Sequence, residues 1–376
     1  MNYIFLSLVN LGGAMHHINE LQQLFCRNFN WNKARISCLT QILQALICAR
    51  TVNLTQISSF FQSNAKQESS YRRIRRFFSE FSFDITIIIP FILTLFNLKG
   101  QLVLILDRTN WKWGKKNINI LLLSIAYRGI GIPIFWTVFD HQGNSSTLDR
   151  ISVLKKILKH IGHSRIQAFL ADREFIGEEW FRFLKKVKIP FIIRIKKNTM
   201  AGGIRDYYQI PIIELWKNKQ RSKTVINHPV LIWGHLLYVS ICQAKGTKEP
   251  MIIVSNIKFR DPIGLYRRRW EIETLFGCLK TRGFRIEDTH MTAPDRIERL
   301  LFVLSIAFCW SYKLGIIKNA EKCIPKKSHG RLSKSLFRAG LDFLRSAILL
   351  IDEKTGELSK IIKVLIGYKL RSYRIE

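Results

Sequence analysis

The sequence predicts a mixed α/β protein in which a helical N-terminal region precedes a sheet-based core. Residues 16–98 carry apolar side chains at helical spacing. After Gly100, the near-continuous apolar runs Leu102–Asp107 and Asn119–Tyr127 are typical of strands buried on both faces. Helix-period segments such as Leu148–Ile161 then alternate with further apolar runs. This alternation after residue 100 indicates an α/β core.

The composition indicates a partner that is a polyanion. The chain has 376 residues, with 60 Lys and Arg against 27 Asp and Glu, and a formal net charge of +33. A folded chain this basic repels itself unless it meets nucleic acid or an acidic surface. The longest apolar runs, Ile85–Leu98 and Leu300–Trp310, are shorter than the roughly 18–20 residues that span a bilayer, so we expect no membrane partner. The seven cysteines form no CxxC pair, which favours a reducing compartment.

The first segment, residues 1–98, is predicted to be a helical DNA-binding domain. Its first fourteen residues are apolar without the positive start of a signal peptide, and we interpret them as an upstream start before Met15. Residues 34–49 and 54–61 follow as helices, and Asn53 suits the N-cap of the second.

A short arginine-rich helix is predicted between Ser69 and Phe81. Its basic side chains alternate with aromatic ones, a composition that suits DNA phosphates and groove edges. The alternative interpretation is a charged helix facing solvent. The arginines in this stretch are Arg72, Arg73, Arg75 and Arg76.

The core is predicted from an order of elements that resembles the ribonuclease-H-like fold. Three strands, of which the last two are joined by a turn at 128–131, precede a helix, a strand at 165–170, a helix at 178–187 and a strand at 190–195. In the ribonuclease-H-like fold, the first and fourth strands are neighbours at the centre of the sheet. Asp107 and Asp172 end these strands, so their carboxylates are expected side by side. The predicted parts are 99–198 (core, first part), 199–258 (β-rich insertion), 259–318 (core, second part) and 319–376 (basic helical C-terminal region).

A third acidic side chain is predicted on a helix that runs from Tyr266 to Lys280. At about 100° per residue, Tyr266, Arg269, Glu273 and Lys280 fall on one face of that helix. A face that combines a phenol, two cations and a carboxylate suits a ligand rich in phosphate. The alternative is a solvated amphipathic helix with Arg–Glu pairs.

Three converging carboxylates, from Asp107, Asp172 and Glu273, predict a site for hard divalent cations. Two Mg²⁺ ions about 4 Å apart, for which Mn²⁺ can substitute, activate an attacking oxygen and stabilise a leaving oxygen in an in-line displacement at phosphorus. A protein with such a site needs no covalent nucleophile.

These residues resemble an insertion-sequence transposase with an Asp–Asp–Glu triad, in the group marked by the Tyr-(2)-Arg-(3)-Glu-(6)-Lys signature. Tyr266, Arg269, Glu273 and Lys280 keep every spacing of that signature, and the runs LDRTNWKWG and ADREF resemble the group's blocks around its two aspartates. The likeness covers roughly residues 40–315. It implies cut-and-paste transposition at terminal inverted repeats, with double-stranded repeat and target DNA as partners and a dimer in the DNA complex.

The resemblance also implies roles for single residues. Asp107, Asp172 and Glu273 would hold the metals, and the Tyr, Arg and Lys of the signature would contact phosphates beside the cut. In relatives an aromatic of the insertion stacks on a flipped base; Trp233 and Trp216 are candidates, with a core role as the alternative. One or two of the residues next to the aspartates are expected to touch DNA while the others support the strand ends: Arg108, Thr109, Asn110 and Arg173.

Three other functions compete with this interpretation. A ribonuclease-H-like nuclease without strand transfer would use the same triad, and strand transfer of a precut end distinguishes it. A transposon-derived, non-catalytic DNA-binding protein predicts a broken triad, whereas this one is whole. A general RNA-binding protein would carry aromatic stacking signatures, such as an RNP block, which the sequence lacks.

Overall fold

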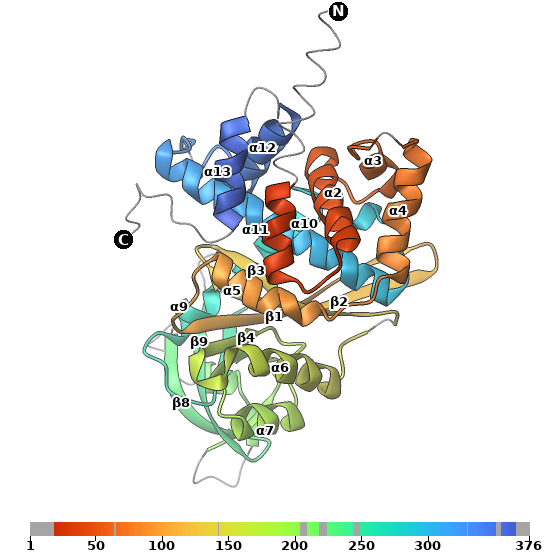
Figure 1. Ribbon diagram of the computed structural model, residues 1–376. Coiled ribbons are helices and arrows are strands. Elements are labelled where there is room, and N and C mark those ends of the chain that lie inside the picture. Colours follow the sequence, from red (N-terminus) through yellow and green to blue (C-terminus); the bar gives the residue numbers. More distant parts are fainter. Residues whose placement is uncertain are drawn as a thin grey trace, which may run out of the picture. The chain divides into compact units, whose positions relative to one another are not determined.

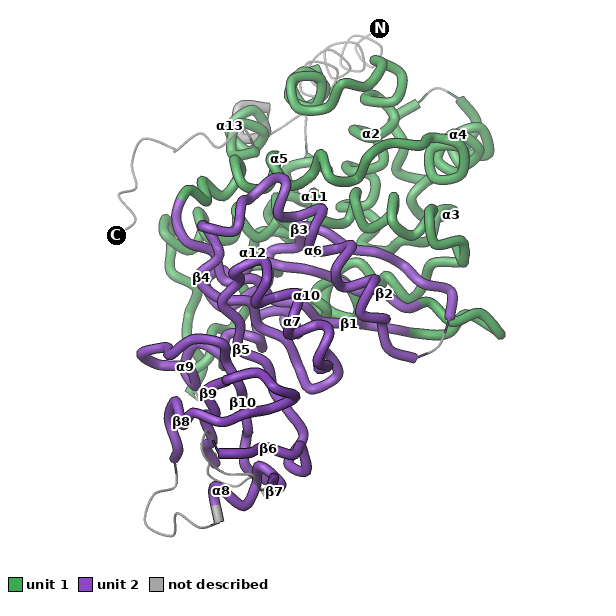
Figure 2. The backbone as a smooth tube through the Cα atoms, turned by 90° about the horizontal axis from the view of Figure 1, so that it is seen from below, with its two compact units in different colours: residues 1–99, 111–118, 276–376 green, residues 100–110, 119–275 purple. Residues whose placement is uncertain are grey.

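A computed structural model gives a mixed α/β protein with a large sheet and many helices (Figure 1). It describes residues 19–63, 65–141, 143–203, 209–217, 224–243, 249–328, 330–350 and 355–365. The interpretation of residues 1–14 as an upstream start lies outside this range. Two compact units are interleaved along the chain (Figure 2): unit 1 comprises residues 1–99, 111–118 and 276–376, and unit 2 comprises residues 100–110 and 119–275.

The strands of the described residues form one continuous sheet in the order β3-β2-β1-β4-β5-β10-β9-β8-β6-β7. The predicted strands of the core are all present, and β1 is the parallel neighbour of β4, as expected. The strands are β1 (Leu102–Trp113), β2 (Lys116–Tyr127), β3 (Ile130–Phe139), β4 (Ile166–Ala171), β5 (Phe191–Arg194), β6 (Met200–Gly202), β7 (Gln209–Pro211), β8 (Thr224–Ile232), β9 (His235–Cys242) and β10 (Met251–Ser255).

The β-rich insertion joins this sheet directly. Strand β10 pairs antiparallel with β5, through Val254 and Ile193, and β9 and β8 follow it outward. The apolar runs that mark these strands in the sequence therefore extend the core sheet beyond β5.

Two helices of unit 2 pack beside the central strands. The ring of Phe169 on β4 lies against Trp180 of α7, and Phe181 of α7 lies against Phe191 of β5. Helix α6 contacts both α7 and β3, and begins with a capping box in which Ser146 and Asp149 satisfy each other's backbone N–H groups. The helices of this unit are α6 (Thr147–Ile161), α7 (Glu178–Lys186), α8 (Glu214–Lys217) and α9 (Pro262–Arg267).

Unit 1 is built from helices of both ends of the described chain. Helix α11 is buried along most of its length and contacts α2, α4, α12 and α13. The predicted N-cap is confirmed: the Asn53 side chain accepts from the backbone N–H groups of Thr55 and Gln56 at the start of α3. Residues 19–28 are also helical. The labelled helices are α2 (Lys33–Ala49), α3 (Leu54–Ser58), α4 (Gln67–Glu80), α5 (Ile88–Leu95), α11 (Pro294–Glu321), α12 (Leu336–Leu349) and α13 (Thr355–Leu365).

The core of unit 1 joins these helices through an aromatic cluster and a glycine contact. Trp31 packs on Phe81, Phe83 and Phe302, which brings three distant segments together. Where α11 crosses α12, a Cβ on Gly340 would lie 1.8 Å from the Ser311 carbonyl oxygen. Glycine therefore permits the close approach of the two backbones.

Helix α11 is long and apolar enough by composition to cross a membrane, but 83% of its apolar window is buried inside the protein. The bent pair Gln67–Glu80 and Ile85–Leu95 passes the same test only when it is taken as one span. The apolar length of α11 is accounted for by its central place among the helices of unit 1.

Lys313 is a half-buried cation in α11, and it makes unit 1 sensitive to pH. Burial lowers the pKa of its ammonium to about 8, and Nζ donates to the Leu95 carbonyl at the end of α5. The ordinary pKa of a lysine is near 10.5. Between pH 8 and pH 10.5, the Lys313 side chain therefore holds its proton in the unfolded chain but has released it in the folded protein. This group's contribution to stability therefore rises with pH through that window, by at most about 3 kcal/mol.

The free energy of unfolding, measured by urea titration from pH 7.5 to 10.5, is expected to rise with pH in the parent protein relative to Lys313→Met. The exposed Lys322→Met serves as the matched control, and its difference from the parent should not change with pH. If the free energy of unfolding changed with pH in the same way in the parent and in Lys313→Met, the lowered pKa of the Lys313 ammonium would be contradicted.

Candidate active site

Asp107 lies on β1 where the pairing of β1 with β4 ends. The last paired residues are Leu106 on β1 and Ala171 on β4. The sequence interpretation that Asp107 ends its strand is wrong, because β1 continues to Trp113. Strand β1 is a neighbour of β2 as well as of β4, and the short turn that joins β1 to β2 carries Gly114 at φ +55°. What ends at Leu106 is only the contact with β4.

Asp172 directly follows β4, so the register of the two parallel strands places Asp107 and Asp172 side by side at one edge of their pairing. One oxygen of each carboxylate accepts the backbone N–H of the next residue, at 2.8 Å for Asp107 and 2.7 Å for Asp172. Asp172 is the less enclosed of the two, since it is half-buried while Asp107 is 8% exposed.

The predicted single helix from Tyr266 to Lys280 is broken, which corrects the sequence interpretation. Helix α9 ends at Arg267, and α10 (Trp270–Leu279) begins after a tight turn. The backbone N–H groups of Arg269 and Glu271 bond three residues back instead of four, and this tighter winding changes the helix direction. Tyr266 and Glu273 therefore lie on different helices.

Helix α10 is held against the sheet by a close contact and by an arginine. A Cβ on Gly131 of β3 would lie 3.1 Å from Cα of Ile272 and 2.8 Å from Oγ of Ser124, so the helix rests on a position that only glycine fits. Arg268 donates to the Ala126 carbonyl at 2.8 Å and to Glu271 at 3.0 Å. These contacts fix the first turn of α10, from which Glu273 projects.

Arg269 links the carboxylate of β1 to that of α10. Its Nη1 donates to Oδ2 of Asp107 at 2.7 Å, and its Nη2 lies 3.4 Å from Oε1 of Glu273. The side chain of Arg269 is 10% exposed, whereas the side chain of Glu273 is 41% exposed. A buried cation thus stands between two of the three predicted metal ligands.

The electrostatics follow from this burial. Burial raises the pKa of Asp107 to about 7, and the adjacent Arg269 charge and the Arg108 N–H work against that rise. Burial also opposes the charge of Arg269, but attraction to Asp107, to Tyr266 and to Asp172 outweighs it and raises the pKa of the guanidinium. The three acidic groups and Arg269 therefore form one coupled cluster.

Tyr266 is buried at 4% exposure, and its hydroxyl donates to the Ala171 carbonyl at 3.3 Å. Burial, followed by the charge of Asp172, raises the pKa of this phenol. The contact ties α9 to the end of β4, immediately before Asp172. In this arrangement the phenol supports a strand end.

All three guanidinium nitrogens of Arg108 donate hydrogen bonds to other residues of the protein. Its Nε and Nη2 bind the two oxygens of Glu174 at 3.1 Å each, and its Nη groups also donate to Asn119 and Asn144. The guanidinium thereby joins β1 to the loops after β3 and β4. Thr109 is half-buried, whereas Asn110 and Arg173 are exposed.

The remaining predicted residues lie elsewhere in the two units. Lys280 belongs to unit 1, where it pairs with Glu287 at 2.7 Å. Trp233 is 38% exposed at the tight turn between β8 and β9, and its ring packs 5.6 Å from that of Phe181. Trp216 is half-buried, with an indole N–H that has no partner among the described residues.

The arginines of α4 are divided between the protein and the solvent. Arg72 pairs with Glu68 on its own helix, and Arg73 donates to Gln41 and Ser37 of α2. Arg75 and Arg76 are exposed, while Ile74, Phe77 and Phe78 face the core of unit 1. One face of α4 is thus free to contact a ligand.

A family model described as "Transposase DDE domain" matches residues 98–310, more than half of the chain. The chain belongs to the DDE transposase family. The match begins just before β1 and ends within α11, so it includes all three predicted metal ligands of the transposase. No curated protein matches the chain significantly.

Membership implies DNA substrates and a metal-dependent polynucleotidyl transfer, for which DDE transposases generally use divalent cations. No group of three His, Cys, Asp or Glu close enough to hold a metal is found among the described residues. The donor set nevertheless fits: Asp107, Asp172 and Glu273 offer carboxylate oxygens, the ligands that Mg²⁺ prefers. A cationic guanidinium already lies between two of these carboxylates.

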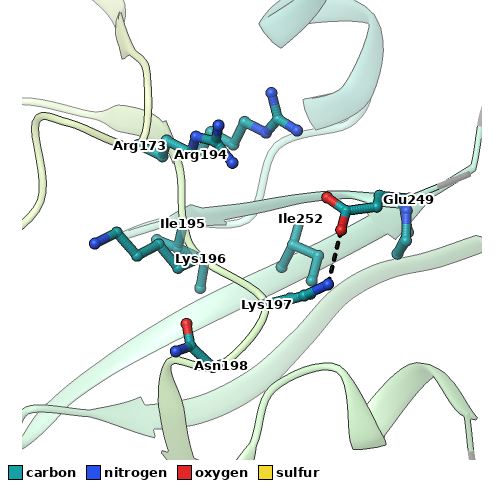
Figure 3. Close-up of a pocket in the computed structure, with 9 residues that line it drawn as sticks. Arg173, Arg194, Ile195, Lys196, Lys197, Asn198, Glu249 and Ile252 are labelled. Atoms are coloured by element: carbon teal, nitrogen blue, oxygen red, sulfur yellow. Dashed lines mark hydrogen bonds and ion pairs between the residues drawn. The ribbon is translucent and has the colours of Figure 1, made fainter. Parts of the chain in front are cut away.

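A set of basic residues lies at the end of β5 and just after it, within the stretch Lys185–Lys223, whose excess of Lys and Arg predicts a basic edge along the site. Arg194, Lys196 and Lys197 line a cavity together with Arg173 (Figure 3). Their signal was the cluster of cations immediately after an apolar strand, a place where parallel sheets collect functional side chains.

Proposed function

We propose that this transposase belongs to the Tyr-(2)-Arg-(3)-Glu-(6)-Lys group and performs cut-and-paste transposition of an insertion sequence. It binds the terminal inverted repeats, cleaves at their edges, and joins the freed ends to target DNA. The observation that carries the proposal is the placement of Asp107 beside Asp172, with Glu273 joined to Asp107 through Arg269. These contacts support a shared site for carboxylates from three distant segments of the chain.

The architecture supports the same proposal. The order β3-β2-β1-β4-β5, with β1, β4 and β5 parallel and β2 antiparallel to β3, is the arrangement that a ribonuclease-H-like core has. We assign the helical N-terminal residues to an all-α DNA-binding part, because the exposed arginines of α4 offer a basic face to phosphates. The active form with DNA is proposed to be a dimer in the bacterial cytoplasm.

In the proposed mechanism, Asp107, Asp172 and Glu273 would hold two Mg²⁺ ions, with Mn²⁺ as a substitute. Bound there, the metal would supply Lewis-acid stabilisation of charge on the attacking and leaving oxygens. The chain's own groups keep the carboxylates in place: Arg269 balances their charge, Tyr266 supports the end of β4, and Arg108 with Glu174 braces the loop after Asp172.

Contacts to DNA phosphates are proposed for polar and cationic side chains that follow the aspartates in sequence, for Lys280 of the signature, and for two exposed arginines of α4. Losing one such charge-assisted contact typically costs about 1.5–3 kcal/mol. The residues concerned are Arg173, Thr109, Asn110, Lys280, Arg75 and Arg76.

The deciding experiment incubates the protein with a duplex that carries the flanking repeat, with Mg²⁺ and then with EDTA. Cleavage at the repeat edge in Mg²⁺, followed by joining of a precut end to plasmid DNA, is expected. Cleavage without joining identifies a nuclease that lacks strand transfer. Binding without cleavage in either Mg²⁺ or Mn²⁺ identifies a DNA-binding protein without catalysis.

Repeat binding is expected to weaken steeply with salt, because many Lys and Arg side chains displace condensed counterions. A protein that neutralises 6–10 phosphates loses roughly 10³–10⁵-fold in affinity between 50 and 200 mM salt. Fluorescence anisotropy at several salt concentrations, in EDTA to prevent cleavage, measures the slope. A slope near zero would contradict a nucleic-acid role for the net charge of +33.

A further inference from the structure

A cavity of about 310 Å³ opens in unit 2 beyond the end of β5 (Figure 3). Four cationic side chains and one carboxylate line it, over an apolar base. Figure 3 shows Arg173 and Arg194 near one another and Lys197 reaching to Glu249, its ion-pair partner at 2.7 Å. We call this cavity the cationic pocket; its lining residues are Arg173, Arg194, Ile195, Lys196, Lys197, Asn198, Glu249, Pro250 and Ile252.

The charges of the cationic pocket are not balanced by its own residues. Glu249 is the single carboxylate of the lining, and it pairs with Lys197, which leaves Arg173, Arg194 and Lys196 without an acidic partner in the lining. The hydrogen bond from Lys197 lowers the pKa of Glu249, and the charges of Arg173 and Arg194 lower it further. An anion that enters the pocket would therefore meet several converging cations.

The sheet register places this pocket next to the predicted metal ligands. Ala171 of β4 is paired with Ile193 of β5, just as Leu106 of β1 is paired with Ala171. The following residues, Asp107, Asp172 and Arg194, therefore come in sequence across the same edge of three parallel strands. The two carboxylates are followed by a guanidinium on the next strand along the sheet.

A second cavity extends the basic surface from this edge. It has a volume of about 420 Å³ and shares Arg173 and Lys196 with the cationic pocket. Asn144, Arg150, Glu174 and Ile176 complete its lining. Arg173 and Lys196 thus line both hollows, and the carboxylate in the second one, Glu174, is paired with Arg108.

We propose that the cationic pocket is a phosphate site that takes a backbone phosphate of the bound DNA, next to the phosphate that is cut. The inference rests on the proposed function, since it requires DNA at the carboxylates. Arg194 and Lys196 contact the phosphate oxygens. Glu249 weakens phosphate binding, because it pairs with Lys197 and adds a negative charge beside the site.

This assignment predicts effects of opposite sign within one pocket. Arg194→Gln combined with Lys196→Gln is expected to weaken binding of repeat-end duplex about tenfold or more, and to reduce the slope of log affinity against log salt by about 0.9 for the one phosphate released. Glu249→Gln is expected to tighten binding about two- to fivefold, because it frees Lys197 and removes an exposed ion pair.

The measurement is fluorescence anisotropy with labelled repeat-end duplex and scrambled duplex, in EDTA. Lys155→Gln combined with Lys159→Gln removes two exposed cations from α6 and serves as the matched control. Thermal unfolding of every variant checks the fold. Inorganic phosphate is added as a competitor, and it should displace duplex from the parent only at millimolar concentration or above.

Three outcomes overturn the inference. The pocket variants behave like the α6 control, or Glu249→Gln leaves binding unchanged, or inorganic phosphate saturates the pocket while duplex affinity stays the same, which identifies a free-phosphate site. Failure of the proposed function gives a different result: the parent protein then binds repeat-end and scrambled duplex equally and cleaves neither in Mg²⁺.

Discussion

Replacing any one of Asp107, Asp172 and Glu273 by its amide is expected to reduce cleavage of repeat DNA by about 10³-fold or more. Asp107→Asn, Asp172→Asn and Glu273→Gln keep the side-chain shape but remove the negative charge that a divalent cation requires. Loss of about 4 kcal/mol of transition-state stabilisation corresponds to a factor of about 10³ in rate. Single-turnover cleavage, resolved on a denaturing gel, measures the effect.

DNA binding is expected to be nearly unchanged in these variants, because affinity comes from many dispersed Lys and Arg contacts. Asp140→Asn, an exposed aspartate after β3, is the matched control and should cleave like the parent. Metal binding measured by calorimetry should fall in the three variants and not in the control. Normal cleavage by any one of the three would remove that residue from the proposed metal site.

Arg269→Ala is expected to destabilise the protein by about 3–5 kcal/mol. The substitution leaves the buried Asp107 carboxylate without its charged partner at 2.7 Å, and an uncompensated buried charge carries a penalty of that size. Chemical unfolding at pH 8 measures the change. Arg267→Ala, an exposed arginine two residues earlier, should have little effect.

A double-mutant cycle tests the cause. If the penalty comes from the unpaired carboxylate, Asp107→Asn should restore much of the stability lost in Arg269→Ala. Additive losses would mean that Arg269 stabilises the site through packing alone. In cleavage assays, Arg269→Ala should also slow strand transfer more than the first nick, because joining needs a positioned DNA end.

The sequence was sufficient to predict the strands of the core and the neighbourhood of two carboxylates. The run Leu102–Asp107 is apolar on both faces, so its place in a central strand followed from burial alone. The position of Asp172 at the end of β4 followed in the same way. The register that brings them together is confirmed by the pairing of Leu106 with Ala171.

Other features depend on long-range contacts that periodicity does not encode. The sequence around the turn between α9 and α10 is helix-forming throughout, so periodicity does not predict the turn. Its position is set by long-range contacts, in which Arg268 donates to the Ala126 carbonyl and α10 packs on Gly131. The engagement of Arg108 by Glu174 required knowledge of which loops meet. The cationic pocket likewise needed β10 to bring Glu249 to the residues after β5.

The interleaving of unit 1 has a consequence for synthesis on the ribosome. Its N-terminal helices are covered by α11 and α12: Arg345 of α12 donates to the Cys48 carbonyl, and Phe302 of α11 packs on Trp31. At about 5–20 residues per second, roughly 250 further residues separate the emergence of α5 from that of α12, a delay of about 13–50 s. During this interval the apolar faces of α2 and α4 lack the partners that bury them, so the nascent chain depends on chaperones or remains partly folded until α12 has left the ribosome.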